Sequence, residues 1–153
     1  MSGIALSREL RDAKGGVAGL PADMIEGETP LIASGKEIVP TGSDRFLSNE
    51  RAFFYTEVYD PALAGPNPPQ ISMRFRVLDR TSGAVKSDSG AASVAGYVKT
   101  GDPVVGVAST IPTTSLAPGP YRFEITTSHT SGPETIVRSV DFDWNYGPVI
   151  LRK

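Results

Sequence analysis

The chain has 153 residues, with 15 basic and 17 acidic side chains, a formal net charge of −2, no cysteine and one histidine. This balance lacks the basic surplus of a nucleic-acid-binding protein, and the lack of cysteine excludes disulfides, thiolate metal sites and thiol nucleophiles. The 16 glycine and 13 proline residues argue against a helical bundle or coiled coil, and apolar runs of strand length argue against membrane insertion.

The first thirty residues are expected to form a partly ordered N-terminal arm. Ile4 and Leu6 either pair with a sheet edge or belong to an irregular segment, and residues 7–13 also fit one or two helical turns. Glycine and proline residues beyond position 14 interrupt both patterns. We therefore divide the chain into an arm over residues 1–30, a folded domain over 31–148 and a C-terminal tail or linker over 149–153.

From residue 31 onward, short apolar or alternating segments recur, each closed by a cluster of Gly, Pro, Asn, Asp or Ser. This spacing is typical of an all-β sandwich or barrel. The segments predicted as strands are 37–39, 52–59, 71–78, 92–98, 104–111, 121–127 and 136–144.

Alternation within three of these segments predicts which side chains face the core, because residues two apart in a strand point the same way. The predicted core residues are Ile71, Met73, Phe75, Val77, Tyr121, Phe123, Ile125, Val140, Phe142 and Trp144. Polar residues occupy the positions between them, which predicts antiparallel sheets with one solvated face.

The connections between the segments carry their own signals. Asp79 and Gly83 bracket a predicted hairpin, since Asp bonds backbone amides at the start of a turn and Gly takes a positive φ at its end. Residues 128–133 have the same composition and predict a second hairpin. The segment 61–69 is too rich in proline to pair in a sheet, so we expect it to cross the edge of the sandwich.

The string Leu-Ala-Pro-Gly-Pro-Tyr-Arg-Phe at 116–123 resembles the corner of immunoglobulin-like and fibronectin type III-like sandwiches. In those domains a tyrosine at the start of a late strand caps the turn through its hydroxyl. The resemblance assigns this structural role to Tyr121 and implies an immunoglobulin-like or fibronectin type III-like antiparallel β-sandwich of about seven or eight strands. The cysteines of antibody domains are absent, so an antibody-type domain is not implied.

A wider resemblance covers most of the chain. The strings at 57–60, 76–79 with Gly83, 111–112 with 116–122, and 139–142 follow one another as in the C-terminal β-sandwich region of bacterial von Willebrand factor type A-related proteins. That resemblance implies an accessory domain of an exported protein without known catalysis. The Asp-x-Ser-x-Ser metal motif of the type A domain is missing, so its Mg²⁺-dependent adhesion is not carried over.

Catalytic residue types are scarce. His129, the single histidine, falls in the second predicted hairpin beside Ser and Thr, where we expect it to be exposed rather than held for catalysis. Asp141 and Asp143 lie on one face of a predicted strand about 7 Å apart, which fits an acid and base pair or weak metal ligands, but a flat sheet face favours plain solvation. We expect no enzyme, no cofactor and no metal.

A binding surface is the favoured functional hypothesis. If Phe54, Thr56 and Val58 face the core, then Tyr55 and Tyr59 face outward, and with Arg74 and Arg76 they form a candidate binding patch. In the alternative, the arm covers this face or the register is opposite.

We therefore predict a structural or protein-interaction module of an exported bacterial protein, located outside the cytoplasm although this chain shows no signal peptide. Its partner would be another protein or a neighbouring domain of the parent chain. A carbohydrate-binding module that stacks a glycan on exposed aromatics is the alternative, and a hydrolase using Asp141 and Asp143 is the least favoured.

Overall fold

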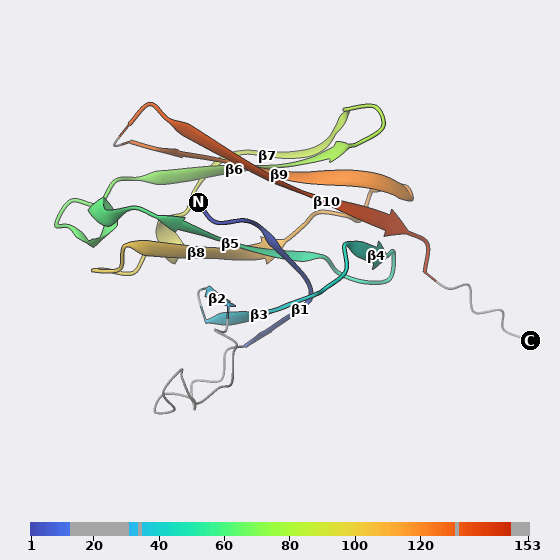
Figure 1. Cartoon of the computed structure of the whole chain (residues 1–153), viewed down its shortest axis with the longest axis horizontal. Coiled ribbons are helices and arrows are strands. Elements are labelled where there is room, and N and C mark those ends of the chain that lie inside the picture. The colour runs from blue at the N-terminus through green and yellow to red at the C-terminus, as the bar shows by residue number, and fades with distance from the viewer. Residues whose placement is uncertain (13–30, 34, 131, 148–153) are drawn as a thin grey trace, which may run out of the picture.

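The computed structural model describes residues 1–12, 31–33, 35–130 and 132–147. Within these ranges the chain is all-β, with ten strands in two five-stranded sheets that form a sandwich (Figure 1). The strands are β1 (Ala5–Asp12), β2 (Leu31–Ala33), β3 (Lys36–Pro40), β4 (Arg45–Leu47), β5 (Phe53–Tyr59), β6 (Ile71–Asp79), β7 (Val85–Ser93), β8 (Val104–Thr110), β9 (Gly119–His129) and β10 (Thr135–Asn145). The predicted fold class is confirmed, with more strands than expected. No helix in the described ranges is long and apolar enough to cross a membrane.

The first sheet has the order β2-β3-β1-β5-β8, and the second has the order β4-β10-β9-β6-β7. All neighbouring strands are antiparallel except β4, which runs parallel to β10. The main core lies between the sheets, and it buries nearly all the residues predicted from alternation, with Phe75 and Val140 packed at its margin. β8 is an end strand of the first sheet and β7 is an end strand of the second.

The N-terminal segment differs from the expected arm. β1 lies inside the first sheet between β3 and β5, with Leu6 opposite Phe54. Where its register with β3 shifts, the fully buried Ser7 accepts a hydrogen bond from the Glu9 amide (2.9 Å) and donates one to the Val39 carbonyl (2.5 Å). The sandwich therefore includes residues before 31. The rest of the predicted arm, residues 13–30, and the predicted tail, residues 149–153, lie outside the described residues.

The first sheet curls back on itself, so that β2 approaches β8. A Cβ atom at Gly106 of β8 would lie 3.2 Å from the carbonyl oxygen of Ile32 in β2, and Figure 1 shows β5 and β8 between the second sheet and the β2–β3 pair. The curl encloses a second apolar cluster of Ala33, Ile38, Phe53, Tyr55 and Ala108. β5 is therefore buried on both faces. Phe54 and Val58 lie in the main core, in agreement with the predicted register in which Phe54, Thr56 and Val58 face inward.

One strand prediction is wrong. The segment 92–98 does not form a strand as a whole, because β7 ends at Ser93 and Ala95–Tyr97 forms a short 3₁₀ turn, η4. Most of β7 is exposed at the edge of its sheet, so its side chains show no alternation that a sequence pattern would detect. β2 and β4, three residues each, were not predicted either.

The predicted connections agree with the structure. A carboxylate oxygen of Asp79 accepts a hydrogen bond from the Thr81 amide (2.7 Å), and Gly83 has a φ of +75°, so this hairpin joins β6 to β7. The second predicted hairpin joins β9 to β10. The proline-rich segment after β5 contains the 3₁₀ turn η3 (Pro61–Ala64) and crosses from the first sheet to the second.

Candidate binding site

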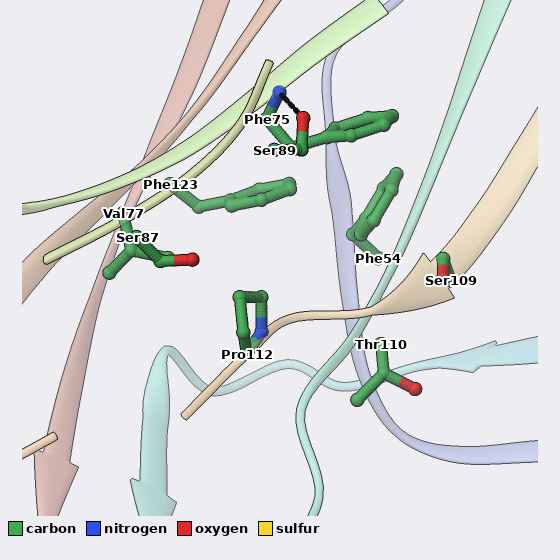
Figure 2. A pocket seen from close by; sticks show the side chains of 9 residues that line it. All are labelled: Phe54, Phe75, Val77, Ser87, Ser89, Ser109, Thr110, Pro112 and Phe123. Carbon is green, nitrogen blue, oxygen red and sulfur yellow. Dashed lines mark hydrogen bonds between the residues drawn. The ribbon is translucent and has the colours of Figure 1, made fainter. Parts of the chain in front are cut away.

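A pocket of about 280 Å³ opens between β7 and β8, at the side where the two sheets end (Figure 2). Its floor consists of core side chains from three strands, and its rim consists of small residues from the two end strands and of Pro112, which follows β8. The lining residues are Phe54, Phe75, Val77, Ser87, Ser89, Ser109, Thr110, Pro112 and Phe123. None of them carries a charge, so the pocket is an apolar hollow edged by hydroxyl groups.

Three phenylalanine rings fix the shape of the floor. The ring centroid of Phe54 lies 5.1 Å from that of Phe75 and 4.8 Å from that of Phe123, both at 43°, while Phe75 and Phe123 are parallel at 6.2 Å. Such tilted and offset arrangements are the favourable ones for aromatic pairs. Phe54 and Phe123 are buried, whereas Phe75 is only half-buried. The floor is therefore held by the core, with one ring partly open to solvent.

A bulge in β7 shapes the rim. The Phe75 amide donates to Ser89 Oγ (2.9 Å), which in turn donates to the Gly90 carbonyl (2.7 Å), and Gly90 has a φ of +67° that glycine tolerates. These hydrogen bonds of the Ser89 side chain take the place of a regular backbone–backbone hydrogen bond at the point where the β6–β7 register shifts. The structure gives no hydrogen bond to the hydroxyls of Ser87 and Ser109 within the described ranges, and both residues line the pocket, so these hydroxyls can bond a ligand or water.

The two tyrosines predicted as binding residues lie away from this pocket. Tyr55 is only 6% exposed, and its hydroxyl donates to Glu57 Oε1 (2.7 Å); burial, aided by the Glu57 carboxylate, raises the pKa of Tyr55. Its ring therefore offers no exposed stacking face to a glycan. It instead helps to line a smaller, polar hollow of about 220 Å³ beside Lys99 and Asp102. Tyr59, at the end of β5, is 63% exposed.

The two predicted arginines lie on the solvated face of the other sheet. Arg74 pairs with Asp88 (Nε to Oδ1, 2.8 Å) and thereby lowers the pKa of that carboxyl group, while Arg76 pairs with Glu124 (Nε to Oε1, 3.0 Å). β5 and β6 belong to different sheets, so the prediction that the arginines and Tyr55 form one patch is wrong. The sequence pattern identified the strands but not their sheets.

Tyr121 makes the contact that the resemblance implies. Its hydroxyl donates to the carbonyl of Ala117 (2.5 Å), and its ring is buried in the main core against Phe142, with centroids 5.8 Å apart. Burial raises the pKa of Tyr121, with a further contribution from Asp79. Tyr121 thus connects the turn before β9 to the core, which is a structural role.

Two of the three polar groups considered for catalysis, His129 and Asp141, are engaged in pairs, while the third, Asp143, contributes its backbone amide to a bond with the Asp44 carbonyl. His129 is not exposed as expected: its side chain is 20% exposed and its Nδ1 lies 3.1 Å from Asp60 Oδ2, because the end of β9 packs beside the crossing segment after β5. Asp141 accepts hydrogen bonds from Arg122, which lowers the pKa of Asp141. Over the ranges that the structure covers, no three metal-ligating side chains gather.

Comparison with protein-family models, with curated proteins and with solved structures gives no match. The geometry of the pocket is therefore the feature that bears on the function of the chain. Alternation predicted its floor residues Phe75 and Phe123 only as core, and nothing in the pattern marked them as accessible. The sequence feature that could have indicated the pocket is the run of mostly small residues at 87–93, because it leaves this part of an end strand without large side chains.

Proposed function

We propose that this domain is a non-catalytic protein-interaction module that binds an extended segment of a partner between β7 and β8. The observation that carries the proposal is the Phe-floored pocket of about 280 Å³ between two end strands. Ligand pockets are concave, mostly apolar and edged by a few polar groups, and this hollow has that composition.

The end strand β7 favours a peptide as the partner. It pairs with β6 on one side, and none of the described residues pairs with its other side. From Ser87 to Ser93 its side chains are small except for Asp88, which is paired with Arg74. An added strand gains main-chain hydrogen bonds along such an edge, while alternate side chains enter neighbouring pockets.

The positions of the polar groups support a binding role over catalysis. His129 is paired with Asp60, and Asp141 is paired with arginines on the solvated face of the second sheet. None of these groups lines the pocket. That the module belongs to an exported bacterial protein is a further part of the proposal, and its support is the sequence resemblance described above.

Selection from a library of displayed random dodecapeptides tests the proposal. Peptides enriched on the wild-type domain are measured against Ser87→Phe, which fills the pocket, and against Ala91→Phe, which places the same ring on the outer face of β7 opposite Arg74. We expect binding to wild type and Ala91→Phe, at least tenfold weaker binding to Ser87→Phe, and slower hydrogen exchange of β7 amides in the complex.

Two results would overturn this function. The first is that no peptide is enriched. The second is that the enriched peptides bind Ser87→Phe as tightly as wild type and leave β7 exchange unchanged, because the peptide would then bind elsewhere.

A further inference from the structure

We infer that the partner anchors itself in the pocket through one uncharged aromatic side chain. This inference rests on the proposed function, since it names the group that the same site accepts. It is carried by three properties of the pocket: its volume, the arrangement of its rings and the lack of charge around it.

The volume fits one aromatic side chain. An apolar protein cavity of about 150 Å³ is large enough to hold benzene, and this pocket measures about 280 Å³. It therefore has room for a phenyl, phenol or indole group together with the Cβ atom that links the ring to a backbone.

The rings of the floor favour an aromatic group over an aliphatic one. Phe75 is half-buried and stands parallel to Phe123, with Phe54 tilted at 43° to both. A fourth ring entering from the solvent side meets a face of this cluster and can adopt the offset or edge-to-face packing that aromatic pairs prefer.

The rim selects against charge. The hydroxyls of Ser87 and Ser109, which lie opposite Val77 and Phe54 on the core side of their sheets, lack a hydrogen bond within the described part of the chain, and all nine lining residues are neutral. A buried carboxylate or ammonium group would lose its hydration without gaining a counter-charge. A phenol hydroxyl or an indole N–H could instead bond to one of the serine hydroxyls.

The strand geometry places the anchor within the partner's sequence. Ser87 and Ser89 of β7 line the pocket, and Lys86 and Asp88 alternate with them. A strand added beside β7 alternates in the same way. The residues directly before and after the aromatic anchor therefore face away from the pocket, and they tolerate charged side chains.

NMR titration with small neutral and charged aromatics tests this inference without a partner. The probes are indole, benzyl alcohol and benzoate, the last two sharing one ring and differing in charge. We expect indole and benzyl alcohol to bind with dissociation constants of about 1 mM or tighter, to shift amides at Phe75, Ser87 and Ser109, and to bind at least tenfold more tightly than benzoate.

Two filling variants from opposite sides of the pocket make the test independent of one substitution. Ser87→Phe and Ser109→Phe should each weaken indole binding at least tenfold, while Ala91→Phe should leave it unchanged, and the amide spectrum of each variant shows whether it folds. Benzoate binding as tightly as benzyl alcohol, or shifts unaffected by both filling variants, would overturn the inference. If selected peptides bind at β7 but lack a common aromatic residue, the inference fails and the proposed function stands; if indole binds but no peptide is enriched, the proposed function fails.

Discussion

Replacing Gly106 by alanine tests the close approach of β2 to β8 in the curled sheet. A methyl group at residue 106 would lie 2.9 Å from the hydroxyl oxygen of Tyr55 and 3.2 Å from the carbonyl oxygen of Ile32. Overpacking of this kind costs about 1–3 kcal/mol, and the loss of glycine freedom in the unfolded chain returns about 0.4–1 kcal/mol. We therefore expect the free energy of unfolding to fall by roughly 1–2 kcal/mol.

Urea unfolding followed by the fluorescence of the buried Trp144 measures this change. An unchanged m-value would show that the variant exposes the same surface on unfolding as the wild type does. Gly96→Ala is the matched control, because Gly96 lies in η4 and a Cβ atom there meets nothing within 4 Å. The control should be as stable as wild type or more so, by up to about 1 kcal/mol.

A double-mutant cycle then locates the clash. In Gly106→Ala combined with Tyr55→Phe, the hydroxyl that the new methyl group meets is absent, so the combined loss should be smaller than the sum of the two single losses. If Gly106→Ala is as stable as Gly96→Ala, the close packing described around Gly106 is wrong. If the two substitutions are additive, the Tyr55 hydroxyl is not the group that the new methyl group meets, and the cost comes from the Ile32 carbonyl of β2.

The remaining predictions concern single polar groups. Tyr121→Phe keeps the buried ring but loses the bond to the Ala117 carbonyl, so urea unfolding should show a loss of about 1 kcal/mol; unchanged stability would mean that the corner bond contributes nothing. Arg122 lowers the pKa of Asp141, so this pair stabilises the fold above about pH 4 and the contribution is lost as the pH falls. Asp141→Asn should therefore show a flatter fall in stability below pH 4, and an equally steep fall would contradict the pairing. Burial raises the pKa of Tyr55, so wild-type stability should decrease as the pH rises above about 10; Tyr55→Phe should decrease less, and identical alkaline profiles would refute this assignment.

Much of the fold could be predicted because it depends on local patterns. Alternation over residues 71–78 identified Ile71, Met73 and Val77 as core, and the string before β9 identified the role of Tyr121. Both signals arise within a few residues of the chain, since the side-chain period of a strand and the bond from Tyr121 to Ala117 are short-range features.

The parts that could not be predicted depend on pairing between distant segments. The sequence of β1 predicts only a weak strand because only Leu6 and its neighbours are apolar, and the place of β1 between β3 and β5 depends on residues 24 or more positions away. β5 looked exposed on one face because the sequence does not show that the first sheet curls over Tyr55. The pocket was missed for the same reason, because it forms between β7 and β8, which are end strands of different sheets.

The chemistry of the rim explains why this pocket stays open. A sandwich whose only requirement were stability would gain by closing the space over Phe75 with a larger side chain, because each apolar group removed from water stabilises the fold. Both rims instead carry small polar residues, Ser87 and Ser89 on β7 and Ser109 on β8. The bulge at Gly90 also makes the free edge of β7 irregular, which limits pairing with arbitrary strands. A peptide that binds here must therefore contribute a side chain that fills the pocket as well as a backbone that pairs, and this double requirement makes the site selective.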